Sequence, residues 1–341
     1  MKFDITLFFL SLITLVTGLL VTKLITRINI LDIPNQRSSH STPTPKGGGI
    51  GIIAAWLVFI TGYYFLYHPE IDTKVIIIVI SSLIMGAQGL GDDLVNISFK
   101  FRLLFQIVIS SIVVLMGLKL RSLAFPYFGE IILSPTSSFL LSVLWLTAFT
   151  NAFNFIDGLN GLSAMAAIVV CAFIFYIFND PISLLMLGLC MGAIGFLRYN
   201  FGEAKIFMSE VGSQFIGFFI ACCALALPYY NNDAAFLVIP FIFFIYIFDT
   251  FITILRRLVM RKNIFEPHRM HLFQLLNRMG WSHKKVALFY AGTSFIAGLV
   301  SFKMIALLPY LQMYFFLGYL ILCSIYCVIV ISLAEKRGIK I

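Results

Sequence analysis

Five groups of polar side chains interrupt an otherwise apolar sequence, and their residue types are those of metal and phosphate chemistry. Ionisable groups at membrane depth are costly and usually persist because they have a function. Carboxylates are candidate ligands of a hard cation, while arginine, lysine and histidine are candidate anion-binding groups. The five groups are Arg37 with His40, Asp92 with Asp93, Asn154 with Asp157, Lys205 with Glu210, and the segment from Arg256 to His271.

The carboxylates favour a divalent-cation site. Asn154 and Asp157 are three residues apart, so on a helical turn they share a face. Asp92 and Asp93 point about 100 degrees apart on a helix, so that one can face a metal while the other faces a cation or substrate. Structural interpretations are also available: Asp92 and Asp93 could form a solvated helix end, and Glu210 could be stabilised by the helix dipole. Without cysteine among them, these oxygen groups suit Mg²⁺ or Mn²⁺ better than zinc.

Two loops carry most of the candidate anion-binding groups. The first, residues 27–49, combines Arg37, His40 and Lys46 with three glycines, whose backbone N–H groups we expect to meet phosphate at the start of the next helix. An ordinary Pro/Gly connector is the alternative. In the second, residues 256–285, His268, Arg269 and His271 suit a diphosphate or nucleotide. The preceding cations are interpreted as anchors at the lipid headgroups: Arg256, Arg257, Arg261 and Lys262.

The elements that must position these groups are membrane helices. The chain is 60% hydrophobic and 11% charged, with a mean hydropathy of +0.99, which excludes a soluble globular domain. Its apolar runs are continuous, which favours helices over a barrel. We expect an all-α bundle forming one domain over 1–341, with a hairpin or ordered loop at 121–137. Eleven spans are predicted: 4–25, 49–67, 75–91, 103–120, 138–153, 161–179, 181–198, 211–230, 235–255, 286–303 and 311–333.

The basic residues predict the orientation of the bundle. If the loops after odd-numbered spans face the cytoplasm, nineteen of the twenty-four lysines and arginines are inside, Arg102 among them. The N-terminus is then outside, and the C-terminus and all five polar groups are cytoplasmic. The net charge of +9 fits anionic lipids and substrates better than nucleic acid, because no nucleic-acid module is visible. Six cysteines lie within the apolar spans and are expected to be packing residues.

Five strings, in this order, resemble the polyprenyl-phosphate N-acetylhexosamine-1-phosphate transferases over residues 4–333. The first loop and the HRMH string are most similar to the initiators of O-antigen synthesis, while the peptidoglycan and teichoic acid enzymes are more distant. The strings are PNQRSSHSTPTPKGGG from Pro34, GDD from Gly91, NAFNFIDG from Asn151, KIFM from Lys205 and HRMH from His268.

The resemblance implies a magnesium-dependent enzyme of the bacterial inner membrane, with manganese as the alternative ion. It would transfer a sugar 1-phosphate from a UDP-N-acetyl amino sugar to undecaprenyl phosphate and release UMP, as in O-antigen lipopolysaccharide synthesis. Asp92 or Asp93 would orient or deprotonate the acceptor, and Asp157 and Glu210 would hold the metal. The substrate-binding residues would be Arg37, His40, Lys46, Asn154, Lys205, His268, Arg269 and His271.

Two departures from the family pattern concern this site. Ser209 and Glu210 stand where the pattern has Gly-Asp, and Asn160 stands where it has Asp. Glutamate keeps the charge but moves it outward by one methylene, and Asn160 is expected to alter sugar or turn contacts. Asp249, inside the ninth predicted span, is interpreted as structural or peripheral.

Several alternatives stay open at this point. A cation- or proton-coupled transporter also uses intramembrane acids, although it would place them near the midplane and on both access routes. A relative that has lost catalysis is the other alternative, raised by Glu210. Direct attack by the lipid phosphate is preferred over a covalent aspartyl-phosphate. The sequence decides neither the sugar nor the oligomeric state, a homo-oligomer being one outcome.

Overall fold

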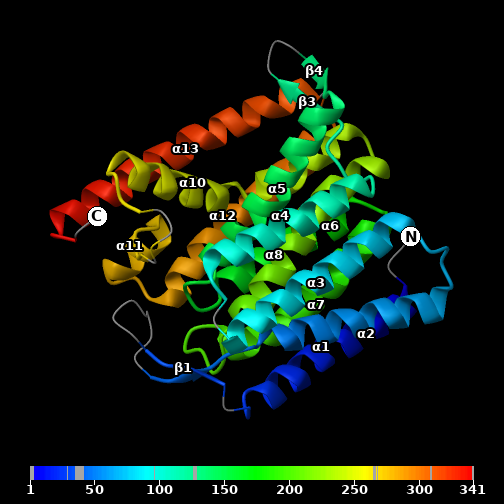
Figure 1. Ribbon diagram of the computed structural model, residues 1–341, viewed down its shortest axis with the longest axis horizontal. Coiled ribbons are helices and arrows are strands. Elements are labelled where there is room, and N and C mark those ends of the chain that lie inside the picture. The colour runs from blue at the N-terminus through cyan, green and yellow to red at the C-terminus, as the bar shows by residue number, and fades with distance from the viewer. Residues whose placement is uncertain are drawn as a thin grey trace.

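The computed structural model describes residues 4–28, 30–34, 42–95, 97–125, 129–263, 266, 268–307 and 309–339. The chain is mostly helical, as expected, with two small antiparallel hairpins (Figure 1). The elements are α1 (Ile5–Ile25), β1 (Leu31–Asp32), β2 (Thr44–Pro45), α2 (Gly49–Tyr67), α3 (Thr73–Val95), α4 (Phe99–Leu115), β3 (Ser122–Phe125), β4 (Gly129–Ile132), α5 (Pro135–Ile156), α6 (Leu162–Ile177), α7 (Pro181–Asn200), α8 (Ser209–Ala226), η1 (Leu227–Tyr229), η2 (Asp233–Leu237), α9 (Val238–Ile242), α10 (Phe244–Val259), α11 (Leu272–Arg278), α12 (His283–Met304) and α13 (Pro309–Lys336).

Helix α8 is the centre of the bundle. Every residue from Val211 to Ala226 is buried, and α3, α5 and α2 pack around it. Two glycines allow the closest approaches. A Cβ at Gly89 of α3 would lie 2.3 Å from the carbonyl oxygen of Glu210, and one at Gly49 of α2 would lie 2.2 Å from the Cα of Gly212. The backbones of α2 and α3 therefore contact the first turns of α8 directly, at the end where the acids lie.

The predicted number of spans is not confirmed. In the described part of the chain, eight helices are long and apolar enough to cross a membrane, or nine when one bent pair counts as a single span. The predicted spans 103–120 and 161–179 correspond to α4 and α6, which have only 17 and 16 residues. A 17-residue helix is about 26 Å long, less than a typical hydrocarbon core. Helix α4 is even less suited to crossing a membrane because two charged residues, Lys100 and Arg102, occupy its first turn.

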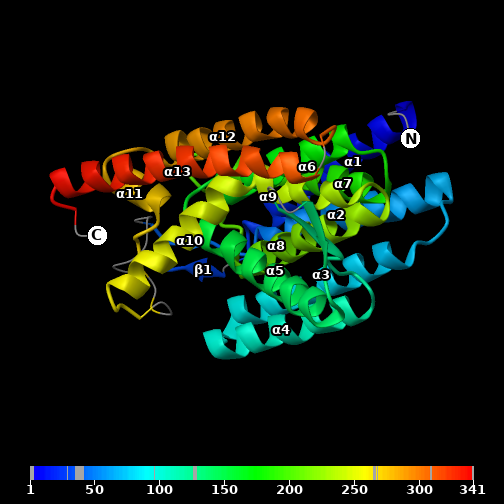
Figure 2. The same cartoon turned by 90° about the horizontal axis from the view of Figure 1, so that it is seen from above.

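The bent pair corresponds to the predicted span 235–255. The segment Asp233–Ile242 and helix α10 meet at 69°, and the helical backbone is interrupted at Phe243. Figure 2 shows α10 leaning away from the other helices, and the chain continues from its C-terminal end to α11. The predicted hairpin within 121–137 is confirmed, since β3 and β4 pair antiparallel. The C-terminus, α11 and β1 lie at one end of the bundle and the N-terminus at the other (Figure 1).

Candidate active site

A cavity of about 1060 Å³ brings together most of the predicted site residues. Its lining comes from the ends of α3, α5 and α8, the first turns of α4, and the connection between α10 and α11. Among the residues predicted from sequence, the cavity is lined by Lys46, Asp92, Asp93, Asn154, Asp157, Glu210, His268, Arg269 and His271. Groups more than 150 residues apart in sequence thus share one site.

Two walls of the cavity carry its charged and titratable groups. The acidic wall consists of Asp92, Asp93, Asp157 and Glu210 together with Arg102, and it is built by α3, α4, α8 and the end of α5. The histidine wall consists of His268, Arg269 and His271, in the loop that precedes α11.

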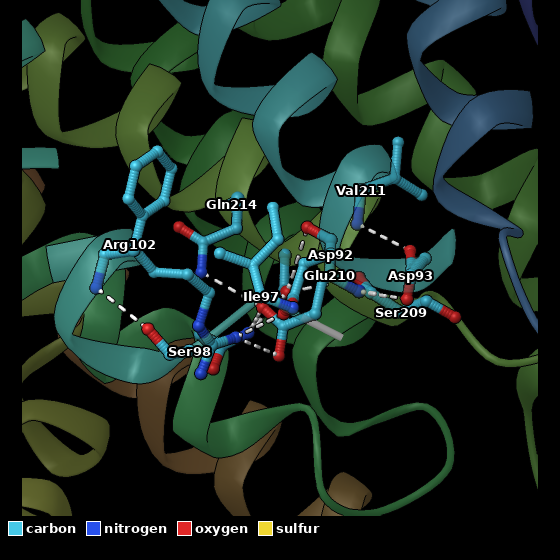
Figure 3. A network of polar contacts seen from close by, with 12 residues as sticks. Asp92, Asp93, Ile97, Ser98, Arg102, Ser209, Glu210, Val211 and Gln214 are labelled. Carbon is cyan, nitrogen blue, oxygen red and sulfur yellow. Dashed lines mark hydrogen bonds and ion pairs between the residues drawn. The ribbon is translucent and has the colours of Figure 1, made fainter. Parts of the chain in front are cut away.

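Arg102 joins two carboxylates of the acidic wall. Its Nη1 lies 2.7 Å from Asp92 Oδ2 and 2.9 Å from Glu210 Oε1, and dashed lines mark these contacts in Figure 3. Asp92 also accepts a hydrogen bond from the backbone N–H of Ile97 at 2.5 Å. One member of the Asp92–Asp93 pair therefore faces a cation, as expected from the angle between adjacent helical side chains.

Asp93 caps the first turn of α8. It accepts hydrogen bonds from the backbone N–H groups of Val211 at 3.0 Å and Glu210 at 3.4 Å (Figure 3). Carboxylates at a helix N-terminus are stabilised by these unpaired donors and by the helix dipole. Lys46 Nζ lies 4.0 Å from Asp93 Oδ1, which brings the end of the first loop into the same cluster.

Glu210 is held by three side-chain donors. Besides Arg102, Asn154 Nδ2 donates to its Oε2 at 2.7 Å, and Gln214 Nε2 donates to the same oxygen at 3.0 Å. Asn154 also donates to Ser213 Oγ at 2.8 Å, so its amide orients Glu210 from the neighbouring helix. A row of polar side chains continues behind it, in which Gln106 Nε2 donates to Gln214 and Asn151 Nδ2 donates to Gln106.

Asp157 lies directly after the last residue of α5 and is partly buried. Burial, with the nearby charges of Glu210 and Asp93, raises its pKa to about 7, although a hydrogen bond from Ser163 opposes the shift. Close carboxylates disfavour each other's ionised forms unless a cation compensates them. Asp157 is thus the acid of this wall whose charge is least neutralised by protein donors.

The glycines of the first loop, residues 27–49, make different contacts from those predicted from the sequence. The N–H groups of Gly47, Gly48 and Gly49 donate to Ser209 Oγ and to the carbonyls of Phe207 and Met208, at 2.9 to 3.0 Å. The prediction that these N–H groups are free for phosphate is therefore wrong, because the loop uses them to bind the segment before α8. Ser209 itself adopts φ +66, a conformation that suits glycine, and its hydroxyl accepts the Gly47 bond.

A buried acid organises the histidine wall. Asp249 of α10 is fully buried and accepts hydrogen bonds from the N–H groups of Leu272 and Phe273 at 2.8 and 3.0 Å, which caps α11. The hydroxyl of Tyr290 donates to it at 2.6 Å, and His271 Nδ1 lies 3.4 Å away. This agrees with the structural interpretation of Asp249.

His268 stacks on His271 with ring centroids 5.1 Å apart. Burial, together with the positive electrostatic influence of His271 and Arg257, lowers the pKa of His268 to about 4. The imidazole is therefore neutral near pH 7. Its Nδ1 accepts a hydrogen bond from the Met270 N–H at 3.4 Å, which leaves Nε2 as the protonated nitrogen and hence a donor.

Arg257 corrects one sequence interpretation. It is only 4% exposed and donates to the backbone carbonyl of Asn263 and to the sulfur of Met270. It therefore shapes the loop before the histidine wall rather than anchoring α10 at lipid headgroups. The reason is that the chain turns back over the end of α10, so this side of the helix faces protein.

Three predicted substrate-binding residues are not placed in the cavity. Arg37 and His40 lie outside the described residues, and Lys205 is exposed and does not line the cavity. Asn160 does line it and has a turn contact: its Nδ2 donates to the Gly202 carbonyl at 2.7 Å. A carboxylate lacks that donor, so the departure at Asn160 has a structural use.

Within the described ranges, no group of three or more His, Cys, Asp or Glu side chains is arranged to hold a metal ion. Magnesium, however, usually takes one or two carboxylates together with waters and substrate phosphates. The donor set therefore fits that ion: Asp157 and Glu210 line the same cavity, and their charges influence each other.

Comparison with known proteins identifies the family. Residues 75–228 match the model of glycosyl transferase family 4. A probable undecaprenyl-phosphate N-acetylglucosaminyl 1-phosphate transferase of Bacillus subtilis is 32% identical over 286 residues, covering 80% of this chain and 78% of the relative. The chain belongs to glycosyl transferase family 4. This confirms the resemblance to the polyprenyl-phosphate sugar-1-phosphate transferases.

Other family 4 relatives carry similar names. A decaprenyl-phosphate N-acetylglucosaminephosphotransferase of Mycobacterium leprae is 31% identical, with 82% of this chain and 77% of the relative covered. An undecaprenyl-phosphate alpha-N-acetylglucosaminyl 1-phosphate transferase of Thermotoga maritima is 27% identical over 89% of this chain and 90% of its own length. The family and the apolar helices together make this a multi-pass membrane protein of a phosphotransferase family.

The family 4 site contains residues that the sequence analysis did not select. Arg102 was counted only as one cation of the positive-inside bias, yet it contacts two of the acids. A signal was present, because Arg102 and Gln106 are four residues apart and share a helix face. Gln214 stands in the same relation to Glu210, and Gln106 and Gln214 are both buried in an apolar bundle.

Proposed function

We propose that this protein transfers N-acetylhexosamine 1-phosphate, or the 1-phosphate of a related amino sugar, from a UDP-sugar to undecaprenyl phosphate. The reaction takes place at the cytoplasmic face of the bacterial inner membrane and releases UMP. The lipid diphosphate sugar that results begins a cell-surface polysaccharide such as O-antigen. The sugar named for the family 4 relatives, N-acetylglucosamine, is the first donor to test.

The cavity lining is the observation that carries this proposal. Charged residues meet an apolar strip on α4, α5 and α10, in which Leu144 is 62% exposed. An acceptor with a phosphate head and a long hydrocarbon tail can contact both the charged residues and the apolar strip. A soluble nucleotide alone has no hydrocarbon chain to contact the strip. The strip consists of Phe99, Leu103, Leu144, Ala148 and Ile254.

The charge of the cavity argues for a divalent cation. Its described lining contains six acids, namely Asp32, Asp92, Asp93, Asp157, Glu210 and Glu266, but three cations, namely Lys46, Arg102 and Arg269. The formal charge of these nine side chains is −3, and both proposed reactants are anions. Magnesium, or manganese as the alternative, would be held by Asp157 and Glu210 and would neutralise charge on the diphosphate.

The remaining residues bind and orient the reactants. An oxygen of the acceptor phosphate attacks the sugar-bound phosphorus of the UDP-sugar, and the bond from that phosphorus to the bridging oxygen of UMP breaks. Lys46, His268, Arg269 and His271 bind phosphate and nucleotide, His268 as a neutral donor. Arg37, His40 and Lys205 are proposed to assist in binding the phosphates of the reactants.

Direct attack is the preferred route. Asp92 is hydrogen-bonded to Arg102 and the Ile97 N–H, and Asp93 to two N–H groups of α8. Carboxylates stabilised in this way are weak nucleophiles, which supports orientation of the acceptor rather than a covalent intermediate. Base catalysis is a small contribution, because a phosphate monoester with a second pKa of about 6 is mostly ionised at pH 7.

The test is a reconstituted transfer assay. Purified protein in detergent, with Mg²⁺ and UDP-N-acetylglucosamine, should release UMP only when undecaprenyl phosphate is present. A panel of UDP-N-acetyl amino sugars, each assayed with Mg²⁺ and with Mn²⁺, identifies the donor. Absence of UMP with every donor and both ions would count against catalysis and favour a relative that binds without turnover.

A further inference from the structure

Arg102 is half-buried, yet it uses only one nitrogen of its guanidinium for its ion pairs. Its contacts with Asp92 and Glu210 both use Nη1, so neither carboxylate is bound through two parallel nitrogens. Within the described chain, its Nε is buried and has no hydrogen-bond partner. A buried donor without a partner is costly and calls for an explanation. Two-nitrogen binding is the geometry with which arginine recognises phosphate.

Arg102 lies where the charged and apolar parts of the cavity meet. It is on the first turn of α4, one residue before Leu103 of the apolar strip, while its other side contacts the acidic wall. A phosphate attached to a hydrocarbon tail in that strip would place its oxygens beside this guanidinium. The partly exposed side chain, at 19%, is reachable from the cavity.

The carboxylate that Arg102 holds is a proposed metal ligand. Glu210 Oε1 contacts Arg102, and its Oε2 accepts from Asn154 and Gln214. A divalent ion that binds this carboxylate competes with the positive guanidinium for the same oxygen. Metal binding and the Arg102–Glu210 ion pair are therefore opposed.

We propose that Arg102 couples the two binding events: the acceptor phosphate draws the guanidinium away from Glu210 and Asp92, and the released carboxylate then binds the divalent ion. This inference rests on the proposed function. It adds that the acceptor phosphate promotes binding of the divalent ion, so that the two affinities are coupled. Linkage requires reciprocity, so the ion strengthens acceptor binding by the same factor. With both ligands present, the guanidinium pairs with the phosphate and the Glu210 carboxylate pairs with the ion, so neither side chain loses a partner of opposite charge.

The test measures Mn²⁺ affinity from the electron paramagnetic resonance signal of the free ion, without any sugar donor. Undecaprenyl phosphate should tighten Mn²⁺ binding by about tenfold, within the usual range of coupling. Undecaprenol, which has the same tail without the phosphate, should not. Arg102→Gln should bind Mn²⁺ more tightly than wild type in the absence of acceptor, and undecaprenyl phosphate should then tighten it less.

The matched control is Lys100→Gln, which removes an exposed cation from the same helical turn without touching the acids. Lys100→Gln should bind Mn²⁺ as wild type does. This result would show that the effect of Arg102→Gln comes from loss of the ion pair and not from the change in net charge. Equal Mn²⁺ affinity with and without undecaprenyl phosphate in wild type would overturn the inference. An equal acceptor effect in Arg102→Gln and wild type would do the same. The UMP assay reports independently on the proposed function, so the two can fail separately.

Discussion

The acidic wall and the histidine wall face one cavity but are built in opposite ways. The four acids come from three helices, α3, α5 and α8, and contacts between residues far apart in sequence help to fix them, such as Asn154 to Glu210. The histidines come from one short loop, which a single buried carboxylate, Asp249, ties to the start of α11. The first wall depends on how helices pack, and the second depends on one capping interaction. Substitutions should therefore act locally on the first wall and collectively on the second.

The largest effect is expected at Asp157. Asp157→Asn keeps the shape but removes the least compensated charge of the acidic wall, so the UMP formation rate should fall at least ~100-fold. Asp157→Ala should abolish turnover. Both should retain thermal stability, because removing a charge whose burial raises its pKa does not harm folding. A wild-type rate in either variant would remove Asp157 from the site.

Asp249→Ala should disturb the whole histidine wall without touching the acidic wall. The N–H groups of Leu272 and Phe273 and the Tyr290 hydroxyl would lose their buried acceptor, at a cost of about 1–3 kcal/mol each if unreplaced. We expect a lower unfolding temperature and a raised KM for the UDP-sugar. Mn²⁺ affinity should be unchanged. A loss of metal binding would show that the two walls are not separable.

His268 gives a pH-dependent test of the histidine wall. Its pKa is about 4 in the folded protein, below the ordinary value of 6.5, so the folded state binds fewer protons than the unfolded state between these values. Its contribution to stability is therefore complete above about pH 6.5 and is lost as the pH falls toward 4. Thermal unfolding at pH 7 and pH 5 should show a smaller loss for His268→Gln than for wild type. An identical loss would mean that His268 is not held neutral.

His268→Gln also tests the role of the neutral donor. Glutamine supplies an uncharged N–H, whereas alanine supplies none, so transfer activity at pH 7.5 should fall less in His268→Gln than in His268→Ala. Equal losses would indicate that the ring stack with His271 matters more than the hydrogen bond.

The smallest effect is expected at Ser209, where the acidic wall meets the first loop. Ser209→Gly removes the hydroxyl that accepts the Gly47 bond but relieves the left-handed backbone, two effects of about 1 kcal/mol that oppose each other. Ser209→Ala loses the bond and keeps the strain, so its unfolding temperature should be the lower of the two. The reverse order would mean that the left-handed backbone at position 209 costs nothing, because both variants lack the hydroxyl.

The same contrast explains what the sequence could predict. The acids were found because charged residues are conspicuous in an apolar chain, and the grouping of Asp92 with His268 followed from counting spans. Their partners were not found, because Arg102, Gln106 and Gln214 meet the site only through packing of α4 and α8. The predicted count of spans was also not confirmed, since apolar composition does not reveal that α4 and α6 are short. The glycine N–H groups could not be assigned without knowing that the loop contacts residues 207–209.

Gly89 shows how far the demands of such a site extend. It carries no functional group, but any side chain there would press against the Glu210 carbonyl and push α3 from α8. Asp93 would then be drawn off the amides it caps, and Glu210 away from its donors. If every residue of this chain were substituted in turn, Gly89 should prove as intolerant of change as the carboxylates. The spacing of the acids depends on how closely the backbones of α3 and α8 approach, and only glycine permits that approach.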